Sequence, residues 1–264
     1  MKRVVYTDLD GTLLDLETYS FSKALDTLEQ IKDAGVPLVF CSSKTRNEQE
    51  YYQKAMGLNE PFIVENGSAI FIPKGYFSIE IPFNTYQTST YDVICLGENV
   101  NKVRSLLAQH RANGSSEFKF YADLAVADVS SITGLGEDAA RRAMQRDFSE
   151  TILTGPMDSQ FNQELLENGF RSIPGSKFET VVGANADKGR AVEILNSLFI
   201  AEFGPIETIG IGDSRNDEEM LRVVDKAFLV QKAHGKWDAR INTKLNRVAA
   251  VGPDGWNEVI KSNL

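Results

Sequence analysis

Two aspartates lie two residues apart near the start of the chain, directly after a short apolar run. Asp8 and Asp10 follow residues 4–7, and the next residue, Gly11, permits a sharp turn of the backbone. If the apolar run is a buried strand, both side chains share one face at its carboxyl end, where open α/β sheets bind ligands. Carboxylates this close repel each other unless a cation or a shared proton stabilises them. The pair indicates a divalent metal or an acid/base couple, and solvated aspartates at a capped strand end are the alternative.

A second acidic turn follows another apolar run later in the chain. Asp213 and Asp217 come directly after residues 206–211. Parallel strands would bring both acidic turns to one edge of a sheet, so four carboxylates would surround one point. Mg²⁺ prefers hard oxygen ligands and is often held by a few carboxylates together with a substrate phosphate. The two turns therefore predict a Mg²⁺ site at which a phosphate could bind.

Hydroxyl and ammonium groups lie at two other positions where a phosphate could be held. Ser42, Ser43 and Lys44 follow the apolar residues 36–41, and Lys188 begins a predicted helix. Each feature alone has an ordinary explanation, since a Ser-Ser turn often caps a helix and a lysine is usually solvated. An ammonium at a helix N-terminus nevertheless stabilises a bound anion. The order of these groups at successive strand ends favours a phosphate site.

Hydrophobic periodicity predicts that strands and helices alternate along the chain. Such a rhythm implies a parallel sheet with right-handed crossovers in an α/β fold. We expect early strands at residues 4–7, 36–41 and 61–64 and helices at residues 21–34 and 45–56. Late elements are expected as a helix at residues 188–203 and strands at residues 206–211, 227–230 and 248–251.

The middle of the chain has the pattern of a separate α/β module. We expect strands at residues 91–96, 118–121, 150–153, 170–173 and 177–182, with helices at residues 100–111, from residue 137, and between residues 153 and 170. Residues 74–90 are rich in turn formers and aromatics, and the junction before the module falls within them, near residues 82–85. The predicted domains are therefore a core of residues 1–83 and 186–264 and an inserted module of residues 84–185.

Composition excludes several classes of function. The 264 residues carry a net charge of −9, which argues against nucleic-acid binding but permits a small phosphorylated ligand. We expect no membrane span and no signal peptide, and Cys41 and Cys95 show no disulfide or metal pattern, so a cytoplasmic location is expected. The segment from Gly210 fails as a dinucleotide loop because Arg215 stands where the last glycine is needed, and no nucleotide-binding P-loop pattern occurs. His110 and His234, the chain's histidines, lie far from the acidic turns, which argues against zinc or a serine triad.

Taken together, these motifs resemble the haloacid dehalogenase superfamily of phosphatases. Residues 8–12, Asp-Leu-Asp-Gly-Thr, are similar to its first motif, Ser42 to the second, Lys188 to the third, and Asp213 with Asp217 to the fourth. The middle module lies where this superfamily carries its larger cap, between the second and third motifs. The resemblance implies a Rossmann-like, doubly wound parallel-sheet core with an inserted α/β cap domain, and phosphoryl transfer that depends on Mg²⁺.

Finer sequence features resemble the mannosyl-3-phosphoglycerate phosphatase family within that superfamily. They are residues 41–46, 65–71, 148–151 and 187–189. This resemblance implies hydrolysis of mannosyl-3-phosphoglycerate to mannosylglycerate and phosphate. The expected partner is a small phosphorylated sugar, and the sequence does not indicate an oligomeric state.

The resemblance also implies a role for each motif residue. Asp8 would attack phosphorus and form an aspartyl phosphate, while Asp10 would protonate the leaving oxygen and later activate water. Ser42 and Lys188 would bind the transferring phosphoryl oxygens. The metal ligands would be Asp8, the main-chain carbonyl of Asp10, Asp213, and Asp217 directly or through water.

Substrate-binding residues are expected on both parts of the molecule. On the core they are Ser43, Lys44, Arg46 and Asn66. On the cap, Arg146, Ser176 and Lys177 are candidate donors to the glycerate carboxylate and Glu150 is a candidate acceptor of sugar hydroxyls. An arginine in a cap helix is also commonly just a solvated charge. We expect the cap to close over the substrate and exclude water.

Three alternatives remain open at this stage. The substrate could be glucosyl-3-phosphoglycerate or a phosphorylated disaccharide, because cap residues decide between sugars. The protein could be a phospho-aspartate switch, since receiver domains also place acidic clusters on a doubly wound sheet. It could also be a sugar-phosphate binding protein without turnover, although its acidic positions are intact.

Overall fold

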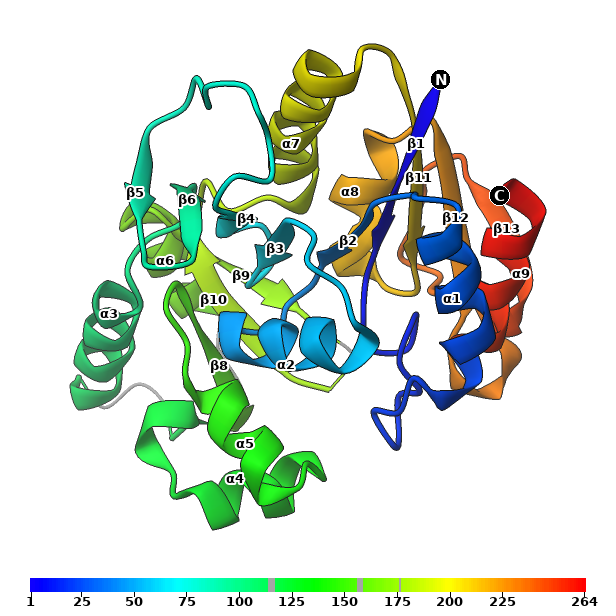
Figure 1. Ribbon diagram of the computed structural model, residues 1–264. Helices are drawn as coiled ribbons and strands as arrows, with labels where there is room; N and C mark the ends of the chain where they lie inside the picture. The colour runs from blue at the N-terminus through cyan, green and yellow to red at the C-terminus, as the bar shows by residue number, and fades with distance from the viewer. Residues whose placement is uncertain (114–116, 156–158, 176) are drawn as a thin grey trace.

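The computed structural model consists of a helix-flanked main sheet and a smaller domain with a sheet of its own (Figure 1). It describes residues 1–113, 117–155, 159–175 and 177–264. Within these ranges, no helix is both long and apolar enough to cross a membrane.

The main sheet is mixed, although most of it is parallel. Its strands, in spatial order, are β13 (Asn246–Val251), β12 (Lys226–Gln231), β11 (Ile206–Gly212), β1 (Lys2–Thr7), β2 (Leu38–Cys41), β3 (Phe62–Val64), β4 (Ala69–Pro73), β6 (Tyr91–Cys95) and β5 (Thr85–Gln87). All pairs from β13 to β3 are parallel, and the pairs from β3 to β5 are antiparallel. The predicted α/β class with a parallel-sheet core is confirmed, and the β4 edge adds antiparallel strands that the sequence did not indicate.

Strand β1 lies in the interior of this sheet and is covered on both faces. It pairs with β11 on one side and with β2 on the other. Because side chains alternate along a strand, Val5 packs with one hydrophobic cluster and Val4 and Tyr6 with another. Burial on both faces explains why β1 reads as a continuous apolar run rather than an alternating one.

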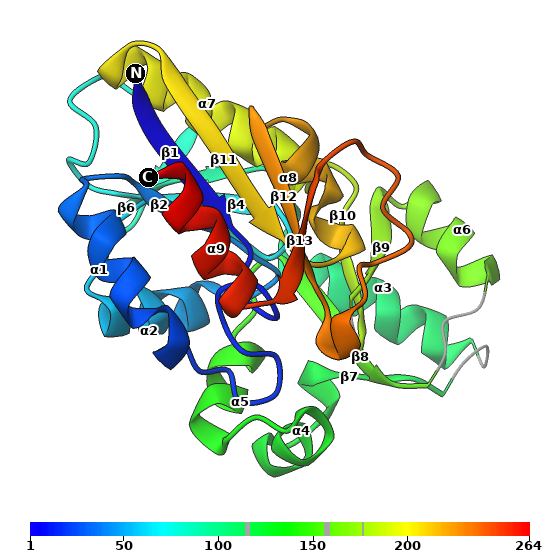
Figure 2. The same ribbon diagram turned by 90° about the vertical axis from the view of Figure 1, so that its right-hand side faces the viewer.

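Helices cover the two faces of the main sheet (Figure 2). One face packs against α1 (Leu25–Asp33), α2 (Arg46–Met56) and α9 (Asp254–Asn263), and the other against α7 (Lys188–Phe203) and α8 (Glu218–Arg222). The buried side chains include Leu28, Met56 and Trp256 on the first face and Leu195 and Met220 on the second. This double cover fixes the carboxyl ends of the parallel strands at one edge, next to the smaller domain (Figure 2).

The local sequence determines where helix α2, which borders the site, begins and ends. The Thr45 hydroxyl accepts a hydrogen bond from the Glu48 N–H, and the Glu48 carboxylate accepts one from the Thr45 N–H, which forms a capping box. Gly57 ends the helix with a φ of 67°, a left-handed conformation that glycine adopts readily. The box fixes the turn between β2 and α2, which carries Ser43 and Lys44.

The smaller domain, the cap, has an antiparallel sheet with its own core. Its strand order is β7 (Lys119–Phe120), β8 (Ser149–Thr154), β10 (Glu179–Gly183) and β9 (Phe170–Pro174). Its helices are α3 (Val100–Ala112), α4 (Val126–Thr133), α5 (Glu137–Met144) and α6 (Ser159–Glu167). Buried Val103, Leu107, Phe118 and Val181 belong to a cluster separate from those of the main sheet. The cap lies beyond the carboxyl ends of the parallel strands (Figure 2).

One strand belongs to a different part of the molecule than predicted. A strand forms at Tyr91–Cys95, but β6 is hydrogen-bonded to β4 in the main sheet and not to the cap sheet. The sequence pattern predicted the strand but not its partner, because pairing depends on distant contacts. Strands β4 and β5 and helices α4, α8 and α9 were not predicted. We propose that the cap begins near residue 97 rather than at residue 84.

Candidate active site

The two acidic turns meet at the carboxyl edge of the main sheet. The Asp8 N–H donates to the Ile211 carbonyl at 2.9 Å, which ties the end of β1 to the end of β11. Gly11 has a φ of 79°, and a Cβ at this position would lie 3.1 Å from Oδ2 of Asp213. The positive φ and this tight contact both favour glycine at the point where the two turns approach each other.

Asp8, Asp213 and Asp217 form a buried group of carboxylates. Each offers one oxygen, and these oxygens lie within 4.8 Å of one another. Oδ2 of Asp217 accepts hydrogen bonds from the N–H groups of Asp213 and Ser214, at 3.0 and 3.1 Å, which fixes its orientation. The predicted convergence of the two turns is confirmed. A set of buried carboxylate oxygens fits a hard divalent cation such as Mg²⁺.

Lys188 lies beneath these carboxylates at the start of α7. Its Nζ is 2.9 Å from Oδ1 of Asp8 and 2.7 Å from Oδ1 of Asp217, and the side chain is fully buried. Burial alone would lower the pKa of Lys188, but the neighbouring Asp217 and Asp8 outweigh it and hold the pKa above its usual value. Lys188 is therefore a permanent cation at the centre of the site.

One ammonium does not balance the negative charge of the carboxylate group. Burial, followed by the Asp217 carboxylate, raises the pKa of Asp8 to about 7 even though Lys188 opposes the shift. The pKa of Asp213 is raised for the same reasons, burial first and then Asp217 and Asp8. Both carboxylates would be stabilised in their charged form by an additional cation.

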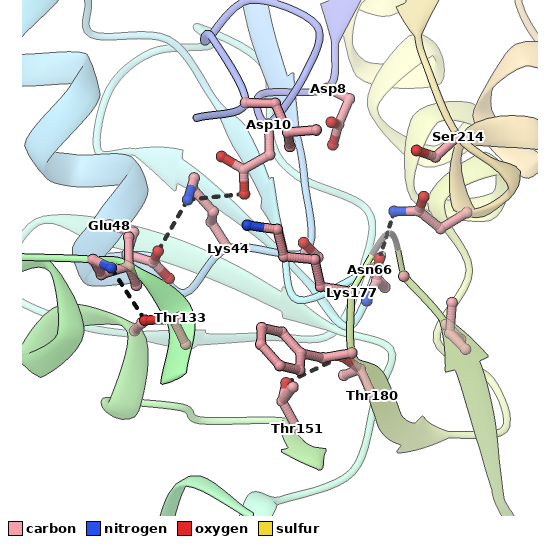
Figure 3. Close-up of a pocket in the computed structure, with 18 of the residues that line it drawn as sticks. Asp8, Asp10, Lys44, Glu48, Asn66, Thr133, Thr151, Lys177, Thr180 and Ser214 are labelled. Atoms are coloured by element: carbon pink, nitrogen blue, oxygen red, sulfur yellow. Dashed lines mark hydrogen bonds and ion pairs between the residues drawn. The ribbon is translucent and has the colours of Figure 1, made fainter. Parts of the chain in front are cut away.

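The Asp10 carboxylate points away from this group, which corrects the prediction that four carboxylates surround one point. Its Oδ2 lies 3.0 Å from Nζ of Lys44, and the same ammonium lies 3.2 Å from Oε1 of Glu48 (Figure 3). Oδ1 of Asp10 is buried, and it has no hydrogen-bond partner among the described residues. Burial raises the pKa of Asp10 although Lys44 opposes it. The Asp10 side chain is thus separate from the group formed by Asp8, Asp213 and Asp217. Within the described part of the chain, Oδ1 of Asp10 is free to interact with a ligand.

A cavity lies between these residues of the core and the cap (Figure 3). Several predicted site residues line it. They are Asp8, Asp10, Ser43, Lys44, Asn66, Arg146, Lys177 and Asp213. Arg146 and Lys177 come from the cap and the others from turns of the core, so the cavity has cationic groups on both sides.

Other predicted residues do not reach this cavity. Ser42 is fully buried at the end of β2, and Lys188 and Asp217 lie beneath the floor. The Glu150 carboxylate forms a salt bridge with Arg104, whose Nε is 2.7 Å away, so its predicted contact with a sugar is not supported. Arg46 lies over the ring of Phe71, 5.9 Å from its centroid, and is not among the described lining residues. Ser176 lies outside the described residues.

Some lining residues were not predicted. They are Tyr19, Glu48, Tyr121, Thr133, Thr151, Thr180, Ser214 and Asn216. Glu48 could have been identified from the capping-box pattern that places it beside Lys44, and Ser214 and Asn216 from their position in the second acidic turn. The hydroxyls of Thr151 and Thr180 in the cap lie 3.1 Å apart. No local sequence pattern predicts this contact, because the folding of the cap brings the two residues together.

The fold is that of a capped α/β protein of the Rossmann-like type. Its helix-flanked sheet carries buried aspartates and a lysine at the carboxyl edge, next to an inserted cap. The sequence pattern of the family described as haloacid dehalogenase-like hydrolase matches residues 5–241. The chain belongs to this family. Membership in a hydrolase family argues against the non-catalytic switch considered above.

Curated proteins of similar sequence carry related names. A glucosyl-3-phosphoglycerate/mannosyl-3-phosphoglycerate phosphatase of Persephonella marina is 39% identical over 260 residues, which cover 97% of this chain and 95% of that protein. A mannosyl-3-phosphoglycerate phosphatase of Pyrococcus horikoshii is 41% identical over 230 residues, covering 87% and 91%. Among solved structures, Thermoplasma acidophilum 0175 superposes with a TM-score of 0.68 at 17% identity and covers 99% of this chain and 98% of its own. That likeness supports the fold alone.

Proposed function

We propose that the protein is a Mg²⁺-dependent phosphatase that hydrolyses mannosyl-3-phosphoglycerate to mannosylglycerate and phosphate. One observation carries this proposal: Asp8 lies beside Lys188, Asp213 and Asp217 at the floor of a cavity that the cap covers. The names of the similar proteins supply the substrate class. Glucosyl-3-phosphoglycerate is a second candidate, because the name of the Persephonella marina relative includes it.

Asp8 is the proposed nucleophile. Its carboxylate oxygen attacks phosphorus in line, the bond from phosphorus to the glycerate oxygen breaks, and an aspartyl phosphate forms. Lys188, which contacts Asp8, would stabilise the charge on the transferring phosphoryl oxygens. Water then attacks phosphorus, releases phosphate and restores Asp8.

Mg²⁺ would be held by Asp8, the main-chain carbonyl of Asp10, Asp213 and Asp217. When bound, the ion supplies positive charge that reduces the repulsion between Asp8 and a phosphate dianion. The carboxylate oxygens grouped within 4.8 Å fit this requirement.

Asp10 is the proposed general acid and base. It would protonate the leaving glycerate oxygen and then take a proton from the attacking water. A general acid must be protonated when it acts, and burial raises the pKa of Asp10 in that direction. Its Oδ1 has no hydrogen-bond partner among the described residues, so it would be the atom that exchanges the proton.

The rest of the substrate would occupy the cap side of the cavity. Arg146 and Lys177 would bind the glycerate carboxylate, because each brings a cationic group to the lining. The hydroxyls of Tyr121, Thr151 and Thr180 would bind the sugar. Ser43, Lys44 and Asn66 would complete the pocket from the core.

Phosphate release across a panel of glycosyl-phosphoglycerates, with Mg²⁺ and with chelator, tests the proposal. We expect turnover with Mg²⁺ and a preference for the mannosyl ester over the glucosyl ester. Asp8→Asn removes the nucleophile at nearly constant volume and should abolish release. Turnover by Asp8→Asn, or hydrolysis of simple phosphate esters with no activity on any glycosyl-phosphoglycerate, would contradict the proposal.

A further inference from the structure

Glu65 lies in a strained turn of the core, directly after β3. Its φ is 48° and that of Asn66 is 60°, values in the left-handed region that residues other than glycine seldom adopt. Such strain persists where surrounding contacts hold the backbone in place. The Glu65 side chain is fully buried, so its carboxylate requires partners.

Those partners come from the cap. Oε1 of Glu65 accepts from the Asp147 N–H at 2.8 Å, and Oε2 accepts from the Phe148 N–H at 3.1 Å and the Ser149 hydroxyl at 2.5 Å. These residues lie between α5 and the start of β8. A carboxylate of the core therefore holds the segment through which the chain enters the central part of the cap sheet.

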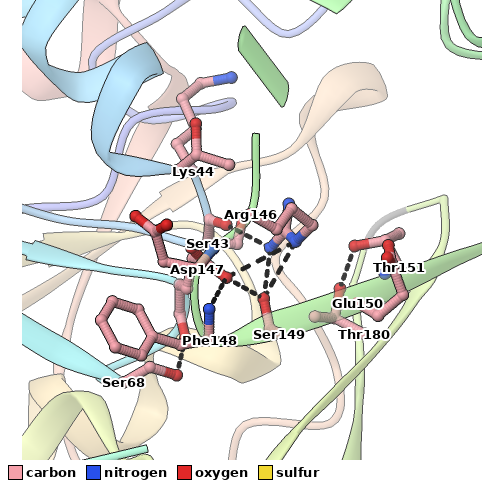
Figure 4. Close-up of polar contacts among 12 residues, drawn as sticks. Ser43, Lys44, Ser68, Arg146, Asp147, Phe148, Ser149, Glu150, Thr151 and Thr180 are labelled. Carbon is pink, nitrogen blue, oxygen red and sulfur yellow. Dashed lines mark hydrogen bonds and ion pairs between the residues drawn. The ribbon is translucent and has the colours of Figure 1, made fainter. Parts of the chain in front are cut away.

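Ser149, which contacts Glu65, also contacts Arg146 in the cavity wall (Figure 4). Because the Ser149 hydroxyl donates its proton to Glu65, its lone pairs are left to accept from Nε and Nη2 of Arg146, at 3.0 and 2.7 Å. Nη2 also donates to the carbonyl of Ser43 at 3.1 Å. The order of donors from Arg146 through Ser149 to Glu65 fixes the direction in which the guanidinium faces.

A glutamine could not replace Glu65 in this arrangement. Each Glu65 oxygen faces a backbone N–H, so either orientation of a glutamine amide would place its NH₂ group against an N–H donor. With the NH₂ toward Ser149, the hydroxyl would have to accept instead of donate, and Arg146 would lose an acceptor. The charge of Glu65 is therefore needed as well as its shape.

We infer that Glu65 is a positioning residue that holds Arg146 in place for the carboxylate of the substrate. It acts through Ser149 and through its own ion pair with Arg146, whose Nε lies 3.7 Å from Oε2 of Glu65. The inference rests on the proposed function, because it gives Arg146 the glycerate end of that substrate. Glu65 itself does not line the cavity, so its effect on substrate choice must pass through Arg146. A purely structural role would instead affect all substrates alike.

The test compares two esters in a double-mutant cycle. For each variant, kcat/KM is measured for mannosyl-3-phosphoglycerate and for p-nitrophenyl phosphate, which has no carboxylate. The ratio is the value for mannosyl-3-phosphoglycerate divided by the value for p-nitrophenyl phosphate. We expect Glu65→Gln and Ser149→Ala each to lower the ratio about tenfold, mainly through KM, because a charge-assisted contact is lost. In an Arg146→Ala background, Glu65→Gln should lower the ratio by less than about twofold.

Asn47→Ala is the matched control. It removes another contact between core and cap, the 2.5 Å hydrogen bond from Asn47 Nδ2 to Gln145 Oε1, outside the cavity lining. The ratio should not change in this variant. Thermal unfolding of every variant checks folding, and if Glu65→Gln does not fold, Ser149→Ala decides the question.

An unchanged ratio in Glu65→Gln or Ser149→Ala would overturn the inference, as would an undiminished effect of Glu65→Gln in the Arg146→Ala background. Failure of the proposed function would look different, since wild-type protein would then not hydrolyse the glycosyl ester. In that case the same cycle is run on dissociation constants for 3-phosphoglycerate and inorganic phosphate. A wild-type protein with no preference for the carboxylated ligand would also overturn the inference.

Discussion

Lys188 is held between two aspartates in the interior of the protein, and its charge balances only part of theirs. Asp8 and Asp217 each contact its ammonium, and Asp213 completes the carboxylate group. These residues were predictable because each follows an apolar strand or begins a helix. The direction of the Asp10 side chain was not, since it depends on Lys44 in the turn before α2 and on Glu48 within that helix.

Replacing Lys188 tests the charge balance at this scale. Lys188→Met should lower the free energy of unfolding in chelator by about 3–5 kcal/mol, because it leaves buried carboxylates without their partner. Urea unfolding measures the loss. Lys23→Met, which breaks the exposed pair between Lys23 and Asp254, is the control and should lose far less because water screens such pairs. Equal losses in the two variants would contradict the assigned role of Lys188.

At the scale of elements, the turn between β3 and β4 supports the start of α7. Gly67 has a φ of 85°, and a Cβ there would lie 2.2 Å from the carbonyl carbon of Asp187, which caps the helix. The early strands were predictable from their apolar runs. The antiparallel return of β4 and its pairing with β6 were not predictable, because they depend on long-range contacts that no local pattern encodes.

Gly67→Ala should therefore disturb the site through α7. We expect a loss of more than about 3 kcal/mol in unfolding free energy and a fall in kcat, because the added methyl clashes with backbone as well as straining φ. Gly75→Ala is a matched control, since Gly75 has a φ of 75° but the described part of the chain places no atom within 4 Å of the added methyl. It should lose about 1 kcal/mol and keep its activity. Similar effects of both substitutions would show that the close approach is unimportant.

For the whole molecule, the cap and the core meet around the cavity. The Thr45 hydroxyl donates to the carbonyl of Arg142 at 2.9 Å, and Nη2 of Arg171 lies 2.9 Å from Oε1 of Glu219. The inserted cap was predictable because it interrupts the core motifs. Its lining threonines were not, since they depend on how the cap sheet lies over the core. Cap closure over substrate remains a prediction.

Stability of the whole chain should depend jointly on pH and Mg²⁺. The raised pKa values of Asp8, about 7, and of Asp213 mean that the folded state binds more protons than the unfolded state between about pH 4 and pH 7. In chelator, the contribution of these groups to stability is therefore lost as pH rises through that window. The gain in thermal midpoint on adding Mg²⁺ should be larger at pH 7 than at pH 5.

Asp213→Asn provides the comparison for this prediction. The variant should gain less stability from Mg²⁺ at pH 7, because one carboxylate of the group is neutral. Scanning calorimetry with Mg²⁺ and with chelator at both pH values measures each gain. A gain that is independent of pH and of Asp213 would mean that Mg²⁺ binds elsewhere.

The most direct measurement is chemical trapping of the residue that becomes phosphorylated. Protein mixed with Mg²⁺ and mannosyl-3-phosphoglycerate is quenched rapidly and treated with borohydride, which reduces an acyl phosphate to an alcohol, and its peptides are analysed by mass spectrometry. We predict reduction at Asp8 alone, with none in Asp8→Asn. Reduction at another residue, or phosphate release by the wild-type protein with no trapped aspartate, would contradict nucleophilic attack by Asp8.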